Sequence, residues 1–301
     1  MGKNAQMAEA ATGETRAASG QLTVGELPGA QEVFGRAAGE NFSVASFVLG
    51  SENRRHLVAI YGYARLVDQI GDAGAGDRLA LLEVFEADLD RVFAGSQPEH
   101  PVLRRLAPSV RQLSLPRGPF QRLIEANRRD QLQADYATFG ELVGYCELSA
   151  NPVGELVLHV FGAATPERVA LSDQVCTALQ LAEHWQDIAE DHAAGRVYLP
   201  AEDLARFGVT REELGAPEPS AALRELIAFE VARARELLDD GARLVALLRG
   251  RARVAVAGYV GGGRAALDAI DAAGHDVLAG PPKATRLRRA RATLSTYLTR
   301  G

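Results

Sequence analysis

Apolar residues recur at three- and four-residue steps along most of the chain, which is the spacing of one face of an α-helix. This periodicity predicts helices over residues 42–70, 79–92, 120–132, 142–161, 169–188, 223–248, 254–270 and 287–298. Glycine and proline residues separate these stretches, and no run of alternating β-branched residues indicates a strand. We therefore predict an all-α chain.

The length and composition favour one large domain. The chain has 301 residues, of which 47% are hydrophobic, and this is enough to bury a sizeable core. Residues 1–30 are rich in Ala, Gly, Ser and Thr and are expected to form a flexible tail, with a single all-α domain over 31–301. No apolar run reaches the roughly 20 residues that cross a bilayer, and the N-terminus lacks the apolar core of a secretory signal. These features predict a cytoplasmic protein.

Charge and motif content exclude several classes of function. The net charge is −6, whereas a general nucleic-acid binder would carry a basic excess, so we expect no nucleic-acid partner. Two cysteines, Cys146 and Cys176, cannot build a disulfide framework or a four-thiolate metal site. The chain also lacks the Walker, dinucleotide-binding, GxSxG and HExxH patterns. ATP, dinucleotide and serine-hydrolase chemistry therefore lose most of their support.

Two segments place acidic residues four positions apart on otherwise apolar helices. The residues of these two stripes are Asp68 and Asp72 in the first segment, and Glu183, Asp187 and Asp191 in the second. A solvated helix face would carry the same spacing, but the apolar flanks of both segments indicate burial. Buried carboxylates persist only where something neutralises them, and Arg65 can neutralise only one. Two such stripes therefore favour a shared site.

The chemistry of these stripes points to Mg²⁺ and a diphosphate. Carboxylate oxygens suit Mg²⁺, which commonly shares its coordination with substrate phosphates. His184 and His192 flank the second stripe, but the Glu-x-x-His pairs of di-iron bundles are absent, so we predict packing roles for them. Metal ions that grip an allylic diphosphate inside an apolar bundle would stabilise the leaving group, and the bundle would shelter the carbocation. Arg65, Arg196 and Tyr198 are predicted to help hold the phosphates, although Arg196 and Tyr198 also suit an ordinary helix exit.

Four segments of the sequence resemble the squalene/phytoene synthase family. They are ENFSVAS (40–46), YGYARLVDQIGD (61–72), YCELSANPVGELVLHVFG (145–162) and LQLAEHWQDIAEDHAAGRVYLPAEDLARFGV (179–209). The likeness extends over residues 34–298 and is greatest to the bacterial hopanoid-pathway branch, the hydroxysqualene synthases. It implies a single-domain isoprenoid-synthase helical bundle with a central apolar cavity between the two acidic segments.

The resemblance also implies roles for single residues. Asp68, Asp72, Asp187 and Asp191 match the metal-binding aspartates of the family. Residues matching positions in the diphosphate, cation or substrate pocket are Tyr61, Arg65, Gln180 and Tyr198, with Tyr145, Asn151 and Tyr259 along the cavity and Ser43 or Ser46 as phosphate-contacting hydroxyls. The sequence departs from the family pattern at Glu183 (usually Asn), Gln69 and Ala73 (often acidic), Asp135 (often basic) and Gly280 (near an Arg of some relatives).

The activity implied by the resemblance is the Mg²⁺-dependent conversion of presqualene diphosphate to hydroxysqualene and diphosphate, with enzymes later in the hopanoid pathway as expected partners. The first alternative is head-to-head condensation of two prenyl diphosphates to presqualene diphosphate or phytoene. The second is a non-catalytic, partner-binding relative, which the departures keep open.

The C-terminal segment raises a separate question about membranes. Its basic residues, Lys283, Arg286, Arg288, Arg289, Arg291 and Arg300, occur without an acidic residue. Leu287, Leu294 and Leu298 form an apolar stripe at helical spacing. Such a segment either lies on anionic lipid at the inner face of the membrane, or packs on the body with a solvated basic face.

Overall fold

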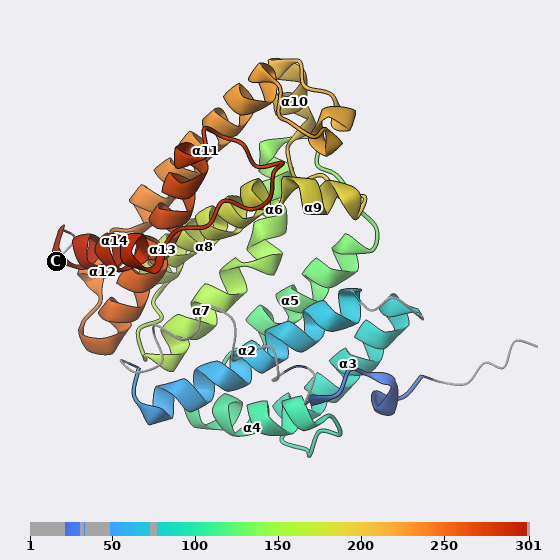
Figure 1. The fold of residues 1–301 in the computed structure, drawn as a ribbon. Coiled ribbons are helices and arrows are strands. Elements are labelled where there is room, and N and C mark those ends of the chain that lie inside the picture. The colour runs from blue at the N-terminus through green and yellow to red at the C-terminus, as the bar shows by residue number, and fades with distance from the viewer. Residues whose placement is uncertain (1–21, 31–32, 34–48, 73–76, 300–301) are drawn as a thin grey trace, which may run out of the picture.

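The computed structural model describes residues 22–30, 33, 49–72 and 77–299 (Figure 1). Its elements are the 3-10 helix η1 (Val24–Glu26), α2 (Ser51–Asp72), α3 (Arg78–Phe93), α4 (Pro101–Leu113), α5 (Arg117–Asp130), α6 (Phe139–Ser149), α7 (Asn151–Val160), α8 (Pro166–Gln186), α9 (Ile188–Ala193), α10 (Ala201–Phe207), the 3-10 helix η3 (Arg211–Gly215), α11 (Ala221–Gly241), α12 (Leu244–Leu247), α13 (Gly250–Ala272) and α14 (Arg286–Thr299). These residues form no strand, and the one β-bridge among them joins Asp135 to Val197. The all-α prediction is confirmed.

Some predicted helices are divided. The stretch expected over 142–161 is two helices, α6 and α7, which meet at Ala150. Pro152 lies in the first turn of α7, where its missing N–H costs nothing, whereas within a continuous helix it would remove a backbone hydrogen bond. The stretch expected over 169–188 likewise ends at Gln186 and restarts at Ile188.

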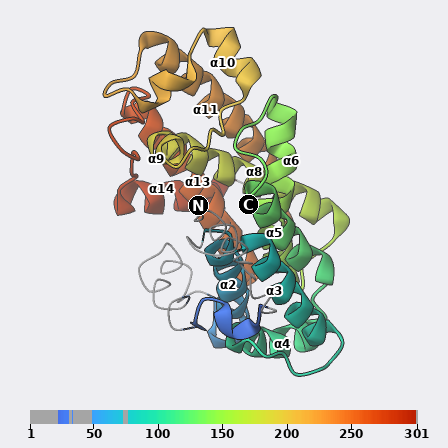
Figure 2. The ribbon, with the colours of Figure 1, turned by 90° about the vertical axis from the view of Figure 1, so that its right-hand side faces the viewer.

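The helices surround two hydrophobic cores. Helices α2, α3, α4 and α5 enclose one core, which includes Tyr63, Phe85 and Phe120. Helices α6, α8, α11 and α13 enclose the other, which includes Trp185 and Leu238. Helix α7 contributes to both and packs against α2 as well as α8. The two acidic segments therefore belong to different halves of the molecule, which Figure 2 shows one above the other.

The beginning of the described chain is packed against the body. Leu27 is buried in the core of the first half. Nε2 of His100 lies 3.1 Å from the carbonyl oxygen of Pro28. The flexible tail was expected to reach residue 30, whereas residues 22–30 have a defined place. Residues 1–21 lie outside the described part, so the tail stays a prediction there.

No helix in the described part of the chain is both long enough and apolar enough to span a bilayer.

Candidate active site

The first acidic stripe lies at the carboxyl end of α2 and is held by α5. The side chain of Asn127 donates a hydrogen bond from Nδ2 to Asp68 Oδ1 at 3.3 Å. Gln131 Nε2 donates to the carbonyl oxygen of Gly71 at 3.1 Å. A Cβ atom at Gly71 would lie 2.1 Å from Asn127 Oδ1, so a larger residue there would displace the Asn127 side chain from this position.

Carboxylates from α2 and α5 lie close enough to influence one another. The apolar flanks predict that this stripe is buried, but the structure leaves the side chains of Asp68 and Asp72 exposed, so the prediction of burial is wrong here. Neighbouring protein atoms still desolvate Asp68, and this desolvation, together with the negative charges of Asp72 and Asp130, raises its pKa to about 6. Burial also raises the pKa of Asp130 to about 6, although Tyr145 donates a hydrogen bond from its hydroxyl to Asp130 Oδ2 at 2.8 Å. This end of α2 is therefore rich in negative charge that is costly to keep.

The second acidic stripe crosses a break between two helices. Asp187 ends α8 and precedes α9, with φ −106° and ψ 15°. The backbone N–H of Asp187 donates a hydrogen bond to the carbonyl oxygen of Glu183 at 3.0 Å. The backbone N–H of Asp191 donates to the carbonyl oxygen of Asp187 at 2.8 Å. These two bonds keep the helical spacing across the break, so the predicted stripe survives although the predicted continuous helix is wrong here. Glu183 is exposed, whereas Asp187 and Asp191 are half-buried.

A left-handed glycine ends α9 and turns the chain back toward the site. Gly195 has φ +82°, and the N–H of Arg196 donates to the carbonyl oxygen of Asp191 at 2.9 Å, a common way to close a helix. The N–H of Val197 then donates to the carbonyl oxygen of Ala134 at 2.8 Å. The GRVYLP segment is thereby fixed beside the chain that follows α5.

Arg196 lies between the two acidic segments. Its Nη1 is 3.6 Å from Asp72 Oδ1 at the end of α2. Its positive charge also lowers the pKa of Asp191, which burial, with the nearby charge of Asp187, nevertheless raises to about 6. Carboxylates more than 100 residues apart in the sequence therefore share one arginine. One carboxylate of each acidic segment is therefore within reach of the same guanidinium, and the shared site stays a prediction.

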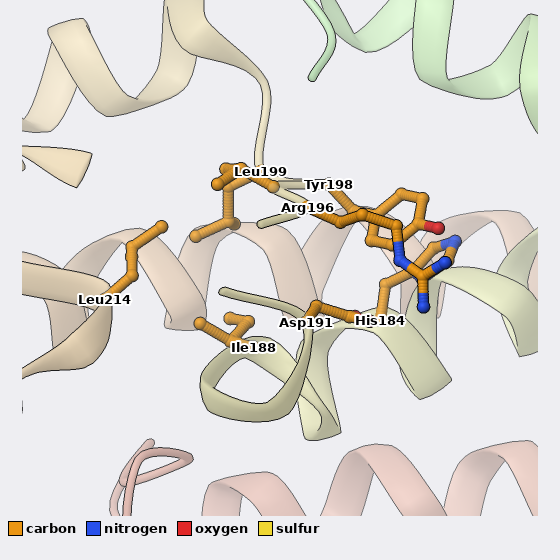
Figure 3. Close-up of a pocket in the computed structure, with 8 residues that line it drawn as sticks. His184, Ile188, Asp191, Arg196, Tyr198, Leu199 and Leu214 are labelled. Carbon is orange, nitrogen blue, oxygen red and sulfur yellow. The ribbon is translucent and has the colours of Figure 1, made fainter. Parts of the chain in front are cut away.

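Four aromatic rings pack beside Arg196. His184 stacks on Tyr198 with ring centroids 3.7 Å apart, and Tyr145 and Tyr136 lie 5.8 and 5.9 Å from Tyr198. Figure 3 shows His184, Tyr198 and Arg196 gathered at one end of the site. Burial, with the charge of Arg196, lowers the pKa of His184 to about 3, so its ring is neutral at pH 7. The predicted packing role of His184 fits this geometry.

A small cavity of about 10 Å³ lies beside these rings, lined by Ile188, Asp191, Arg196 and Leu214 among others (Figure 3). Such a volume holds about one water molecule. It is far too small for a prenyl chain. The central apolar cavity that the resemblance implies therefore stays a prediction.

Two arginines of the site keep buried N–H groups without partners. The Nε atoms of Arg65 and Arg196 are buried and have no hydrogen-bond partner among the described residues. The side-chain amide of Gln69, on the same helix as Arg65, is likewise buried and unpartnered. Buried donors are nearly always satisfied, and guanidinium donors are well suited to phosphate oxygens. The site therefore offers two unused cationic donors next to its carboxylates.

Other predicted site residues are placed differently. Gln180 joins the aromatic group, with its Nε2 3.2 Å from His184 Nε2. Asn151 is buried and accepts a hydrogen bond from Thr177 at 3.0 Å, so it links α7 to α8. Tyr259 packs against the core of the first half, and burial raises its pKa to about 12. Tyr61 is half-buried on α2. Ser43 and Ser46 lie outside the described residues.

One departure from the family pattern has a local explanation. Asp135 accepts a hydrogen bond from Arg211 Nη1 at 2.9 Å, and Arg211 Nη2 donates to the carbonyl oxygen of Gly195 at 3.1 Å. The acid at this position thus holds an arginine against the turn that presents Arg196. Both side chains are largely exposed, so the pair orients the turn more than it stabilises the fold.

Sequence reasoning missed two residues of the site, Asn127 and Asp130. Both lie on the last turn of α5, and both face the end of α2. The available signal was a polar pair three residues apart at the end of a predicted helix. That spacing is common on exposed helices, and only the packing of α5 against Gly71 shows its meaning.

The acidic residues have the ligand chemistry that a divalent cation requires, but their side chains are not clustered around one point. Their carboxylate oxygens are the donors that Mg²⁺ prefers, and the raised pKa values of Asp68 and Asp191 show the charge that a cation would offset. No three His, Cys, Asp or Glu side chains in the part described are grouped tightly enough to surround one ion. The Mg²⁺ site stays a prediction.

Comparison with known proteins identifies the family of this chain. A hydroxysqualene synthase from Rhodopseudomonas palustris is 34% identical over 215 residues, 70% of this chain and 72% of the relative. A phytoene synthase from Mycobacterium bovis is 30% identical over 231 residues, 75% and 76% of the two chains. The crystal structure of squalene synthase HpnC from Alicyclobacillus acidocaldarius has a TM-score of 0.76 at 43% identity and covers 84% of this chain and 98% of that one. Residues 36–295 match the squalene/phytoene synthase family, and the chain therefore belongs to this family of prenyltransferase-type synthases.

Proposed function

We propose that the protein converts presqualene diphosphate to hydroxysqualene and diphosphate, with Mg²⁺ as cofactor. The observation that supports this most is the place of Arg196, between the two acidic segments with a buried Nε that has no partner. An anion with several oxygens would accept hydrogen bonds from Arg196 and Arg65 together. The carboxylates alone would repel such an anion, so a cation must lie between them.

The reaction needs a leaving group and a sheltered carbocation. The C–O bond to the diphosphate breaks with its electron pair on oxygen, the cyclopropylcarbinyl cation rearranges, and the oxygen of a water molecule bonds to the cationic carbon and loses a proton. Bound Mg²⁺ supplies electrostatic stabilisation of the departing diphosphate. The residues that would hold it are Asp68, Asp72, Glu183, Asp187 and Asp191.

The chain's own side chains then have distinct roles. Arg65 and Arg196 donate hydrogen bonds to diphosphate oxygens, which fixes the leaving group. The rings of Tyr198 and Tyr145 lie 5.8 Å apart, and the charge of Arg196 acts on Tyr198, so their π-systems would stabilise a cation formed beside them. Burial raises the pKa of both tyrosines, so each keeps its hydroxyl proton and does not trap the cation as a phenolate. Tyr61, on the same helix as Arg65, is proposed to act with them.

Similarity supports the choice of substrate. The hydroxysqualene synthase of Rhodopseudomonas palustris is named for this product. The phytoene synthase of Mycobacterium bovis is nearly as similar, so head-to-head condensation of two prenyl diphosphates is the second candidate. Both reactions would use the same acidic residues and arginines.

Product analysis separates the two candidates. The purified protein with Mg²⁺ is incubated in parallel with presqualene diphosphate and with farnesyl diphosphate, and the products are identified by mass spectrometry. We expect hydroxysqualene from the first and no condensed product from the second. A condensed product from farnesyl diphosphate alone would overturn the assignment. If the protein releases diphosphate from none of the prenyl diphosphates tested, the non-catalytic alternative is favoured instead.

A further inference from the structure

Helix α14 is firmly attached to the body along one face. Thr296 is buried and accepts a hydrogen bond from Arg264 Nη1 at 2.8 Å. A Cβ atom at Gly261 of α13 would lie 2.5 Å from the Cα of Thr293, so the two helices approach as closely as their backbones allow. Arg253 Nη2 also donates to the carbonyl oxygen of Tyr297 at 2.8 Å. The opposite face of α14 is therefore fixed in its orientation.

That opposite face carries a stripe of exposed leucines. Leu287, Leu294 and Leu298 are 69%, 58% and 67% exposed. Their spacing of seven and four residues places them in one line along the helix. At 100° per residue this line is directed away from Thr293 and Thr296, which pack on α13. Large apolar side chains gathered on a water-facing stripe mark a surface that contacts something else.

The charges around the stripe indicate what that surface contacts. Arg288 and Arg291 are exposed beside the leucines, and Arg286 and Lys283 precede them. No acidic residue occurs after Asp276, in a chain whose net charge is −6. Leucines flanked by arginines are typical of helices that lie in the interface of an anionic membrane. A two-fold contact between copies of α14 would instead bring the same basic residues together, which like-charge repulsion disfavours.

We propose that α14 docks this protein on the surface of an anionic bilayer, with Leu287, Leu294 and Leu298 inserted among the lipids and Arg288 and Arg291 at the headgroups. The helix lies in the interface and does not span the bilayer. This proposal does not depend on the substrate assigned above.

The docking helix is also connected to the candidate active site. The segment that enters α14 passes α8 and α9 in Figure 1, and Gln186 donates a hydrogen bond from Nε2 to the carbonyl oxygen of Pro282 in that segment. The charge of Lys283, the next residue, acts on Asp187. Docking of α14 would therefore place the second acidic segment near the membrane surface, where lipid-soluble molecules are concentrated.

Sedimentation with vesicles tests the proposal on the full-length protein. Vesicles of phosphatidylcholine alone are compared with vesicles that also contain phosphatidylglycerol. We expect binding to the anionic vesicles only, weakened by salt. Replacing all three leucines of the stripe by serine should reduce binding at least about tenfold, because the inserted apolar area is lost. Arg288→Gln with Arg291→Gln should reduce it roughly 30-fold, since each arginine near the surface contributes about a factor of five.

Matched controls separate docking from general effects. Leu132 is 79% exposed outside α14, so Leu132→Ser removes an exposed leucine without touching the stripe. Arg111→Gln with Arg243→Gln removes two exposed arginines outside α14, one in α4 and one in the turn between α11 and α12. Both controls should bind anionic vesicles as the unmutated protein does, and circular dichroism should show equal helix content in all variants. Equal binding by the α14 variants, or none by the unmutated protein, would overturn the proposal. Self-association without vesicles that the leucine variant abolishes would overturn it too, because it assigns the stripe to a second copy.

Discussion

Two groups of charged residues in this molecule are built from the same chemistry but are completed differently. In the second half, Arg233 donates to Asp203 Oδ2 at 2.9 Å and lies 3.4 Å from Glu230, which is fully buried. Its guanidinium also covers the ring of Phe139, 4.0 Å from the centroid. The guanidinium of this arginine therefore has charged and aromatic partners within the protein. This group is closed.

The candidate active site contains more carboxylates and leaves its arginines incomplete. Arg196 makes a 3.6 Å ion pair with the exposed Asp72, and its Nε has no partner. Arg65 Nε is in the same state. A closed group stabilises the fold by internal pairing, whereas an open group is prepared to bind an external anion. The contrast predicts that substitutions in the first will damage stability and substitutions in the second will damage function.

The largest effect on stability is expected from Arg233→Met. The variant keeps the apolar stem but leaves the buried carboxylate of Asp203 without its cation, which should lower the free energy of unfolding by about 3–5 kcal/mol. Urea denaturation measures this loss. Arg196→Met is the matched variant of the open group and should change the free energy of unfolding by less than about 1 kcal/mol. Equal losses in the two variants would remove the distinction between the groups.

The largest effect on activity is expected from Asp68→Asn and Asp187→Asn. Each should reduce the rate of diphosphate release about 10²–10³-fold, because each removes charge that holds the leaving-group machinery. Stability should be unchanged or slightly higher, since each substitution relieves repulsion among carboxylates. Steady-state kinetics and urea denaturation give the two results. Asp240→Asn, at an exposed position of α11, is the control and should leave the rate unchanged. A rate like that of the control in either site variant would contradict the prediction.

A smaller effect is expected when the open arginine is replaced. Arg196→Gln should weaken the binding of inorganic pyrophosphate with Mg²⁺ roughly 30-fold, as a hydrogen bond to a charged group contributes about 2 kcal/mol. Arg196→Lys restores the charge but not the Nε donor, so it should recover only part of the affinity. Calorimetric titration compares these variants with Arg243→Gln. Full recovery by lysine would show that charge alone matters there.

The smallest effect is a difference in pH dependence. Burial raises the pKa of Glu230 to about 8, from an ordinary value of 4.5, so between these pH values the folded protein holds a proton that the unfolded chain has released. This group's contribution to stability therefore falls as pH rises, by at most about 1.4 kcal/mol per pH unit. Glu230→Gln cannot titrate and should lack this fall. Urea denaturation at pH 6 and pH 7 should show the unmutated protein losing stability relative to the variant. A constant difference between the two proteins would contradict the prediction.

The sequence predicted the open group better than the closed one. Asp68, Asp72, Asp187 and Asp191 repeat at helical spacing within apolar helices, and this local pattern is visible without a structure. Arg233 and Asp203 are 30 residues apart. Hydrophobic periodicity joins α11, which carries Arg233, to α12, and it does not predict α10, which carries Asp203. Their pairing depends on how α10 packs against α11, which no local spacing indicates.

The same limit applies within the site. Arg196 was predicted beside the phosphates, but its position between Asp72 and Asp191 depends on the left-handed turn at Gly195 and on pairing with the chain after α5. The break at Asp187 was also missed, because hydrophobic periodicity continues through it. Periodicity predicts which residues share a face, whereas the turns and breaks that aim those faces depend on tertiary contacts.

The central claim is that the ends of α2 and of α8 with α9 bind one diphosphate together. A double-mutant cycle on the binding of inorganic pyrophosphate with Mg²⁺, measured by calorimetry for the unmutated protein, Asp68→Asn, Asp187→Asn and the double variant, tests it most directly. We predict that the double variant binds little more weakly than either single variant, because each substitution already disables the shared site. Losses of affinity that simply multiply would show that the two segments act independently and would contradict the claim.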